Sequence, residues 1–424
     1  MRHLIIGAGP AGVVAAETLR QLDSSSDILL IGDESEPPYS RMAIPYLLRG
    51  RIGEEGTYLR KSARYFEERR IEILQERVST ISTDNRSVRL ESGNVEAYDR
   101  LLIATGSSPT SPPIDGVDLP GVHSCWTLED ARSIAARSSS GSKVVLMGAG
   151  FIGCIILEAL ASCGVDLTVV ELENRMVPRM MNQVSGGLIK SWCERRGVTV
   201  LTDTRVEGIA SKDSQLMVSL SEGEEILADL VINATGVRPN TSFLEKSGIE
   251  VDHGILVDQN LRTTCKDIFA AGDVCQGRDF STGDYTVQAI QPTAVEHGKV
   301  AASNMTDGQE VIHRGCLNMN ILDTMGLVST SFGAWEGIDG GQSVECSDLA
   351  RFRYLDLQFD GDVLVGANAL GLTEHIGVIR GLIQTRLRLG VWKERLMDNP
   401  LQLMEAYVAV AHGVSDGRKP TTSS

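Results

Sequence analysis

Two stretches of the sequence decide the fold: HLIIGAGPAG at 3–12 and KVVLMGAGFIG at 143–153. In each stretch, a run of aliphatic residues leads into the pattern G-x-G-x-x-G, after which a helical segment begins. Each copy continues to a second strand that ends in acid, ILLIGDE at 28–34 and LTVVELE at 167–173. This order of strand, turn, helix and strand is typical of a parallel βαβ unit. The chain is therefore predicted to contain two parallel sheets, each with its own ligand crevice.

The first glycine turn has the features of a dinucleotide site. Gly7 permits the tight turn, Gly9 lets the backbone approach a pyrophosphate, and Gly12 allows the helix to pack on the strand. The free N–H groups of the following helix face the anion. Two acids follow at the end of the next strand, Asp33 and Glu34, which lie 21 and 22 residues after Gly12. Either position is suitable for a carboxylate that accepts hydrogen bonds from the ribose hydroxyls, and the spacing does not decide between them. The predicted binding residues of the turn are Gly7, Gly9, Pro10, Ala11 and Gly12.

The second glycine turn also indicates which nicotinamide nucleotide it binds. Glu171 follows Gly153 by 18 residues, and the 2′-phosphate of NADP would lie beside its carboxylate. Two like charges ~4 Å apart repel by on the order of 4 kcal/mol at an effective dielectric of 20. No basic residue follows until Arg175, so we expect NADH to be preferred over NADPH. The predicted binding residues here are Gly148, Gly150, Phe151, Ile152, Gly153 and Glu171.

Composition limits the partners of the chain. The 424 residues are 42% hydrophobic and 23% charged, as in an ordinary globular protein, and their formal net charge is −16. An acidic surface disfavours nucleic acid and anionic membranes. No apolar run approaches the ~20 residues of a membrane span, and we expect no targeting segment, because no apolar h-region or cleavage site is visible before the predicted strand at His3–Ile6. We expect a cytoplasmic protein with no nucleic-acid or membrane partner, and a frayed polar tail at Asp416–Ser424.

The cysteines and histidines show no motif of their own. The eight cysteines include no C-x-x-C pair, and none occurs between Met1 and Ser124. The seven histidines have no spacing suited to a metal site, so no metal is predicted. His297 is interpreted as a partly buried histidine with its hydrogen bonds satisfied. No side chain is assigned as a general acid or base.

The chain changes character after about Gly315. Strands are predicted at Cys316–Phe332 and Arg351–Ala369, with a turn at Phe359–Asp362, followed by two amphipathic helices near 373–389 and 392–410, divided by Asp398–Pro400. This α+β module contains no chemical motif of its own.

Six motifs in order carry a resemblance to a known family: GAGPAG (7–12), PPYSR (37–41), IATG (103–106), GAGFIG (148–153), ATGVRPN (234–240) and FAAGD (269–273). The chain resembles the pyridine nucleotide–disulfide oxidoreductases, in the branch of rubredoxin and ferredoxin reductases and the flavin domain of nitrite reductases. The resemblance covers about residues 1–310. The tail is similar to the nitrite-reductase-like branch, and a closer resemblance is to the NADH-linked flavoprotein subunits of 2-oxoacid oxidoreductase complexes such as phenylglyoxylate dehydrogenase.

The resemblance implies an α/β fold with two Rossmann-like domains of the glutathione-reductase type plus a C-terminal α+β domain. It implies FAD on the first glycine turn and NAD(H) on the second. The implied domains are an FAD-binding domain at 1–115 and 245–314, an NAD(H)-binding domain at 116–244 inserted within it, and an interface domain at 315–424. Beyond the first glycine turn, the implied FAD residues are Asp33 or Glu34, Arg41, Val78, Ala104, Thr105, Gly106, Gly272, Asp273, Pro292 and Thr293. Gly236 joins the NAD residues.

The chain departs from the family pattern at three places. The redox-active cysteines of the thiol branches are missing, so electrons must leave the flavin directly. A Glu on the NAD-domain helix and its partner Lys near the flavin are replaced by Ile155 and Tyr46. Loss of both partners avoids a buried unpaired charge, which would cost roughly 3–5 kcal/mol. Gln291 stands where an aromatic residue usually begins the FAD-facing helix.

The implied activity is hydride exchange between the nicotinamide and flavin N5, with single electrons passing to or from an iron–sulfur or other iron centre. The expected setting is a hetero-oligomeric 2-oxoacid dehydrogenase complex; a free-standing NADH:rubredoxin or ferredoxin reductase is the alternative. A thiol-dependent oxidase, peroxidase or disulfide reductase and a non-enzymatic flavin-binding interaction module are the competing classes.

Overall fold

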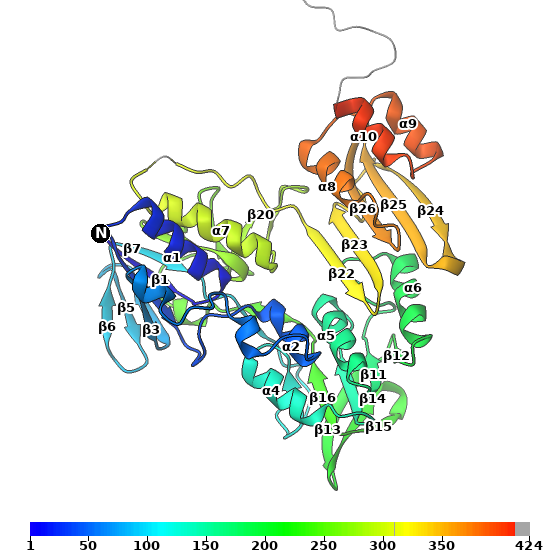
Figure 1. Cartoon of the computed structure of the whole chain (residues 1–424), viewed down its shortest axis with the longest axis horizontal. Coiled ribbons are helices and arrows are strands. Elements are labelled where there is room, and N and C mark those ends of the chain that lie inside the picture. Colours follow the sequence, from blue (N-terminus) through cyan, green and yellow to red (C-terminus); the bar gives the residue numbers. More distant parts are fainter. Residues whose placement is uncertain (309, 412–424) are drawn as a thin grey trace, which may run out of the picture. The chain divides into compact units, whose positions relative to one another are not determined.

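The computed structural model describes residues 1–308 and 310–411, which form two compact units. The first unit comprises Met1–Pro113, His123–Ser139 and Thr235–Cys316. The second comprises Ile114–Val122, Ser140–Ala234 and the described chain from Leu317. The tail predicted at 416–424 lies outside the described residues. Each unit contains one of the two glycine turns (Figure 1).

A parallel five-stranded sheet forms the centre of the first unit, in the order β19-β7-β1-β2-β3. Strands β1, β2, β7 and β19 are largely buried and consist mostly of Leu and Ile, as expected for strands that are covered on both faces, whereas the edge strand β3 is mostly exposed. The strands are β1 (Arg2–Ile6), β2 (Asp27–Gly32), β3 (Ile71–Gln75), β7 (Arg100–Ile103) and β19 (Ile268–Ala270).

Helices α1 (Pro10–Leu22) and α7 (Gln291–Asn304) lie side by side in the first unit (Figure 1). Their close contact requires glycine, because a Cβ on Gly298 would lie 2.4 Å from the carbonyl oxygen of Ala11. Segments almost 300 residues apart in sequence are thereby brought together, so the first unit is discontinuous in sequence.

Smaller elements surround this core. An antiparallel sheet contains β4 (Val78–Ser82), β5 (Ser87–Leu90) and β6 (Val95–Ala97), and β8 (Ser107–Pro109) pairs with β17 (Val237–Pro239). A third sheet consists of β18 (Ile255–Leu256), β20 (Cys275–Arg278) and β21 (Tyr285–Thr286). The remaining helices are α2 (Ile44–Leu48), α3 (Tyr65–Glu68) and α4 (Leu128–Arg137). Strand β9 (Val122–Ser124) lies where the chain passes from one unit to the other.

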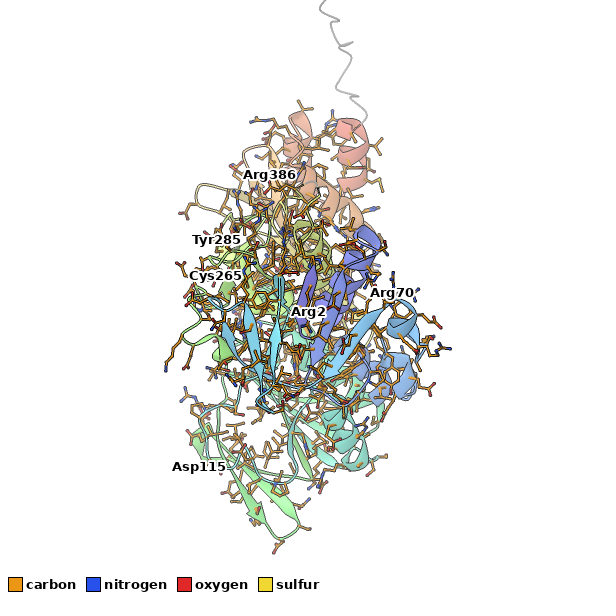
Figure 2. The ribbon with its side chains drawn as sticks, turned by 90° about the vertical axis from the view of Figure 1, so that its left-hand side faces the viewer. Arg2, Arg70, Asp115, Cys265, Tyr285 and Arg386 are labelled. Atoms are coloured by element: carbon orange, nitrogen blue, oxygen red, sulfur yellow. The ribbon has the colours of Figure 1, made fainter. Side chains whose placement is uncertain are left out.

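The second unit repeats the parallel arrangement, with strands in the order β12-β11-β10-β16. Asp115 lies beside an antiparallel sheet in this unit (Figure 2), where its carbonyl accepts a hydrogen bond from the N–H of Ile209 at 2.9 Å. The strands of both sheets are β10 (Lys143–Met147), β11 (Asp166–Val170), β12 (Thr199–Leu201), β16 (Leu230–Asn233), β13 (Val206–Lys212), β14 (Gln215–Leu220) and β15 (Glu225–Ala228). The helices are α5 (Phe151–Ser162) and α6 (Gln183–Glu194).

The C-terminal part of the second unit is a five-stranded antiparallel sheet in the order β22-β23-β26-β25-β24. Three helices pack against it through a shared apolar core. Its elements are β22 (Met319–Thr324), β23 (Leu327–Gly333), β24 (Gln342–Asp348), β25 (Arg353–Asp360), β26 (Val363–Leu370), α8 (Ile376–Thr385), α9 (Val391–Asp398) and α10 (Leu403–Ala411).

Three details of this module differ from the sequence prediction. The single strand expected at 316–332 is a hairpin, because Met325 and Gly326 both have positive φ and reverse the chain. Strand β24 was missed. The helix predicted at 392–410 is two helices, which separate at the predicted divider Asp398–Pro400 because Pro400 disfavours a helical conformation at Asn399, whose φ and ψ are −145° and 95°. The turn predicted at 359–362 is confirmed.

None of the helices in the described residues combines the length and apolar character that crossing a bilayer requires. The two parallel sheets confirm the predicted fold class. The division into three functional domains stays a prediction. The structure separates two compact units, and the second sheet and the C-terminal module belong to the same one.

Candidate functional site

The first glycine turn connects β1 to α1 with the geometry that an anion requires. Gly7 has φ +112°, and a Cβ there would lie 2.1 Å from the oxygen of Ala104. A Cβ on Gly12 would lie 1.9 Å from the oxygen of Gly7. No described atom lies within 4 Å of a Cβ built on Gly9, which precedes the helix. The turn is therefore closed on its packed side and open at Gly9, as a bound pyrophosphate requires.

The N-terminus of α1 presents its backbone to the same place. Among the described residues, no side chain caps this end of the helix, which begins at Pro10 with Gly9 as its N-cap. The remaining N–H groups and the positive end of the helix dipole are suited to bind phosphate. The pyrophosphate roles predicted for residues 7–12 fit this structure, and they stay a prediction.

A pocket of about 1040 Å³ opens beside the first turn. Ala8, Gly32 and Glu34 line it where β1 and β2 end, and Ile73 and Gln75 line it from β3. The position at the carboxyl ends of parallel strands is where doubly wound sheets bind nucleotides. Glu34, not Asp33, lines this pocket, which favours Glu34 as the ribose ligand. Val78 is buried on β4 and is not among the lining residues.

The PPYSR loop is held together by Arg41. Its guanidinium donates to a Glu34 carboxylate oxygen at 2.7 Å, to the Trp126 carbonyl at 2.8 Å and to the Tyr39 hydroxyl at 3.0 Å. The Tyr39 hydroxyl donates in turn to Glu34, and burial raises the pKa of Tyr39 above its usual range. Arg41 therefore orients the candidate ribose carboxylate as well as the loop. The sequence analysis did not identify Trp126 and Tyr39.

The FAAGD motif places an acid beside the loop after β7. Gly272 has φ +79° and begins a short turn that carries Asp273. Burial raises the pKa of the Asp273 carboxyl, and one of its oxygens accepts from the Ser107 hydroxyl at 3.1 Å. Thr105 and Asn240 exchange hydrogen bonds between side chain and backbone at 3.0 and 2.8 Å. These contacts bring the IATG, ATGVRPN and FAAGD motifs together in the first unit.

Helix α7 begins close to the PPYSR loop. The Ser40 hydroxyl donates to the side-chain oxygen of Gln291, the first residue of the helix. Pro292 occupies the first turn and Thr293 is buried, while no side chain of the described chain caps the helix. Ser40 therefore contacts the position where relatives usually place an aromatic side chain, and the proposed flavin contacts of Pro292 and Thr293 stay a prediction.

The second glycine turn has the same backbone geometry as the first. Gly148 has φ +98°, a Cβ on Gly153 would lie 2.1 Å from the oxygen of Gly148, and no described atom lies within 4 Å of a Cβ on Gly150. Helix α5 starts at Phe151, with Phe151 and Ile152 half-buried in its first turn. The turn therefore fits a second pyrophosphate.

Glu171 directly follows β11, and its carboxylate is directed at the second glycine turn. One oxygen accepts from the N–H of Ala149 at 2.6 Å and the other from the N–H of Glu173 at 2.9 Å. The Arg175 guanidinium donates to the carbonyls of Met181 and Pro178, so it is engaged within its own loop. The local charge is therefore negative, as expected for a site that prefers NADH, and the ribose contact stays a prediction.

The thiols do not form a disulfide relay. All eight cysteines lie in the described residues and are free. Burial raises the pKa of Cys125, the first cysteine in the chain, to about 12, and it also raises the pKa values of Cys154 and Cys275 well above the usual thiol value. Thiols of this kind stay protonated at neutral pH and are poor nucleophiles.

The residues that replace the usual Glu–Lys pair lie on different units. Ile155 is half-buried on α5, and Tyr46 on α2 is 50% exposed. Gly236, with φ +146°, lies next to Thr110 in the first unit. The predicted NAD(H) contact of Gly236 stays a prediction.

A buried cluster that the sequence analysis did not predict lies at the end of the first unit. His297, His313 and Cys316 bring ring nitrogens and sulfur within 4.8 Å of one another. Burial lowers the pKa of His297 to about 3 and raises that of Cys316 to about 12. The signal in the sequence was His313-x-x-Cys316, two potential ligands separated by two residues.

Comparison with known families decides the class of the protein. The family model described as pyridine nucleotide-disulphide oxidoreductase matches residues 1–298. The chain belongs to this family. Its members bind FAD and NAD(H), which confirms the predicted cofactors, and the protein is an FAD-dependent NAD(H) oxidoreductase.

Several relatives of this oxidoreductase match over most of its length. Subunit epsilon of the NADH-dependent phenylglyoxylate dehydrogenase of Aromatoleum evansii is 30% identical over 94% of this chain and 95% of its own. The NADH oxidase of Methanocaldococcus jannaschii is 34% identical over 72% of this chain and 70% of its own. A ferredoxin reductase structure from Rhodopseudomonas palustris has 25% identity and a TM-score of 0.86, and the match covers 96% of this chain and 99% of that chain.

Proposed function

We propose that this flavoprotein exchanges reducing equivalents with NAD(H) and passes single electrons to or from an iron–sulfur or other iron centre in a partner. The proposed setting is a 2-oxoacid dehydrogenase complex of the phenylglyoxylate type, in which the chain is the NADH-linked subunit. The observation that carries this proposal is the match over 94% of the chain to subunit epsilon of such an enzyme. That match extends into the C-terminal module, whose sequence has no chemical motif of its own.

The residues of this chain bind the two nucleotides, orient them and set the local charge around them. The two glycine turns and the helices α1 and α5 bind pyrophosphates, and Glu34 and Glu171 accept from ribose hydroxyls. Asp273 holds the ribityl chain, and the N-terminus of α7 stabilises negative charge near its first turn. Bound FAD supplies the chemistry, because it accepts a hydride and releases electrons one at a time.

The thiol content favours direct electron transfer to a partner. No cysteine precedes Cys125 in the chain, and burial raises the pKa of Cys125, Cys154 and Cys275. A thiol relay needs a reactive thiolate near the flavin. We therefore assign the acceptor to a separate protein or subunit.

Anaerobic stopped-flow absorbance with NADH tests the reaction. We expect NADH to bleach the flavin absorbance without a long-wavelength band from a flavin–thiolate complex. The appearance of such a band would place the protein in the thiol-dependent class. Unchanged flavin absorbance would contradict the enzymatic proposal and favour a flavin-binding interaction module.

A free-standing reductase is the second candidate. The NAD⁺-linked ferredoxin reductase component of the biphenyl dioxygenase system of Paraburkholderia xenovorans is 31% identical over 93% of this chain and 95% of its own. Native mass spectrometry of the protein purified from its source separates the two settings. Larger subunits that remain bound support the complex; a chain that purifies alone and reduces added ferredoxin or rubredoxin supports the free-standing enzyme.

A further inference from the structure

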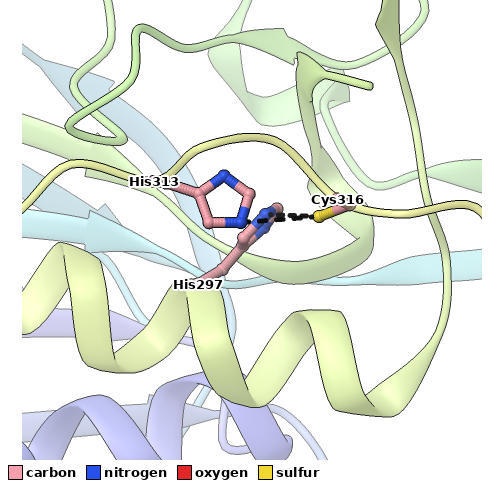
Figure 3. A group of neighbouring side chains, drawn as sticks. All are labelled: His297, His313 and Cys316. Atoms are coloured by element: carbon pink, nitrogen blue, oxygen red, sulfur yellow. Dashed lines mark hydrogen bonds between the residues drawn. The ribbon is translucent and has the colours of Figure 1, made fainter. Parts of the chain in front are cut away.

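The buried cluster of His297, His313 and Cys316 consists of metal-ligand atoms that come from two segments of the first unit (Figure 3). His297 projects from α7, while His313 and Cys316 lie in the chain segment that follows this helix. The three residues are 4%, 5% and 7% exposed. Imidazole and thiolate are the donors that zinc prefers in proteins.

The two sulfur–nitrogen distances of the cluster fit a tetrahedral zinc ion. The sulfur of Cys316 lies 3.2 Å from Nε2 of His297 and 3.6 Å from Nε2 of His313. Zinc bonds of ~2.3 Å to sulfur and ~2.0 Å to nitrogen in tetrahedral geometry place such a pair about 3.5 Å apart. Two ring nitrogens converge on a thiol that can donate only one hydrogen bond.

The second ring nitrogen of His297 also has a suitable partner. Nδ1 lies 3.2 Å from the sulfur of Cys275, and the Cys275 thiol donates to the carbonyl of Gly272 at 3.1 Å. The Cys275 sulfur can then accept from Nδ1–H, which leaves the lone pair of Nε2 directed at the cluster. The backbone nitrogen of Gly272 lies 3.4 Å from Nδ1, and a hydrogen bond from its N–H would favour the opposite tautomer, in which Nε2 carries the proton. Metal content, not hydrogen-bond geometry, therefore decides between the two tautomers of His297.

Hydrogen bonds of the main chain and of the Asn304 side chain position the ligand segment. The N–H of His313 donates to the carbonyl of Gln259 at 2.7 Å, and the N–H of Cys316 donates to that of Arg278 at 3.1 Å. The Asn304 side chain bonds to both backbone groups of Val311. The ligand atoms therefore occupy a preformed arrangement.

We propose that His297, His313 and Cys316 bind one structural Zn²⁺ ion, and that the exposed side chain of Glu296 turns to supply the fourth ligand. The Glu296 carboxylate lies 3.7 Å from Nε2 of His313 on the exposed side of the cluster. Binding displaces the thiol proton of Cys316, the rings donate lone pairs, and no group changes oxidation state. The ion fastens the segment leading to the C-terminal module onto α7, the helix whose first turn we assign to FAD.

Metal analysis of the FAD-loaded protein, expressed in medium supplemented with zinc, tests this proposal. We expect about one zinc per chain in the wild type. We expect at least a tenfold loss of zinc content at equal flavin content in Cys316→Ser and His313→Gln. Cys265→Ser and His253→Gln are matched controls, because these residues are in the same unit outside the cluster, and they should retain the metal.

A second measurement does not depend on the variants being stable. Cobalt exchanged into the wild-type protein should give the absorption of a tetrahedral thiolate-bound ion in the red, where oxidised flavin does not absorb. Glu296→Gln should weaken competition of the site against a zinc chelator roughly tenfold or more. A wild-type protein that neither contains nor takes up zinc, a different metal in the site, or full zinc content in Cys316→Ser would each overturn the proposal.

Discussion

At the scale of single residues, we predict that Glu171 determines which nicotinamide nucleotide is accepted. We expect the double variant Glu171→Gln/Leu172→Arg to lower the ratio of kcat/KM for NADH over NADPH by roughly tenfold or more, because it replaces a repulsive charge with an attractive one. Leu172 is 56% exposed and tolerates the long side chain. Steady-state kinetics with both nucleotides measures the ratio.

The matched control for this prediction is Glu171→Gln/Leu172→Gln, which removes the acid without adding a cation. Flavin content must be measured for both variants, since Glu171 also accepts hydrogen bonds from Ala149 and Glu173. An unchanged nucleotide ratio in a fully flavinated double variant would show that Glu171 is not at the ribose.

Asp356 gives a second prediction at this scale. Burial raises its pKa from 3.8 to about 6, although Gln358 donates to its carboxylate at 3.0 Å. A folded-state pKa above the unfolded value means that the free energy of unfolding falls as pH rises from about 4 through about 6. Asp356→Asn should therefore stabilise the protein at pH 8 by at most roughly 3 kcal/mol, with no gain at pH 4.

Thermal unfolding at the two pH values measures this effect. Asp360→Asn is the control, because Asp360 is exposed on the same strand. A stability difference between Asp356→Asn and wild type that is equal at pH 4 and pH 8 would contradict the assigned titration.

At the scale of secondary-structure elements, the contact between α1 and α7 supports the candidate FAD site. A Cβ at position 298 would lie 2.4 Å from the carbonyl oxygen of Ala11, which is backbone and cannot rotate away. We expect Gly298→Ala to lower the free energy of unfolding by roughly 1–3 kcal/mol and to reduce the FAD retained on purification. Thermal unfolding and the flavin-to-protein absorbance ratio measure the two effects.

Gly187→Ala is the matched control for the helix contact. Gly187 lies within α6, and no described atom is within 4 Å of its added Cβ. Alanine there should be neutral or stabilise the protein by up to about 1 kcal/mol. A Gly298→Ala protein with wild-type stability and flavin content would show that α7 can shift away from α1 without lowering the free energy of unfolding.

The same scale shows what the sequence could predict. The glycine turns and the buried strands were located within a residue or two, because tight turns and parallel strands impose strict local patterns. Strand β24 was missed because QSVECSD at 342–348 is a mostly exposed, polar edge strand. The spacing His313-x-x-Cys316 indicated two ligands of the cluster, but the approach of His297 from α7 arises from the tertiary path of the chain, which no spacing rule contains.

At the scale of the whole molecule, the C-terminal module and the second parallel sheet belong to one compact unit. The Asn368 side chain donates to the carbonyl of Met180 at 3.0 Å, and the Trp192 indole N–H donates to the carbonyl of Thr324 at 3.1 Å. Asn182 contacts the Tyr354 hydroxyl at 2.7 Å. The module is therefore bound to α6 and to the loop before it by polar contacts as well as by packing.

For this reason, we expect that the rest of the second unit does not fold stably in a chain truncated after Cys316. We expect its NADH-dependent flavin reduction to fall at least tenfold, because removing the partners of α6 leaves apolar surface exposed and backbone carbonyls unpaired. The first unit keeps its own core, so FAD retention should fall less than NADH reactivity. Stopped-flow flavin reduction and limited proteolysis of 140–234 measure the outcome, with Trp192→Phe as a control that removes the indole hydrogen bonds and keeps an aromatic ring. A truncated protein with wild-type NADH kinetics would show that the second sheet folds without the module.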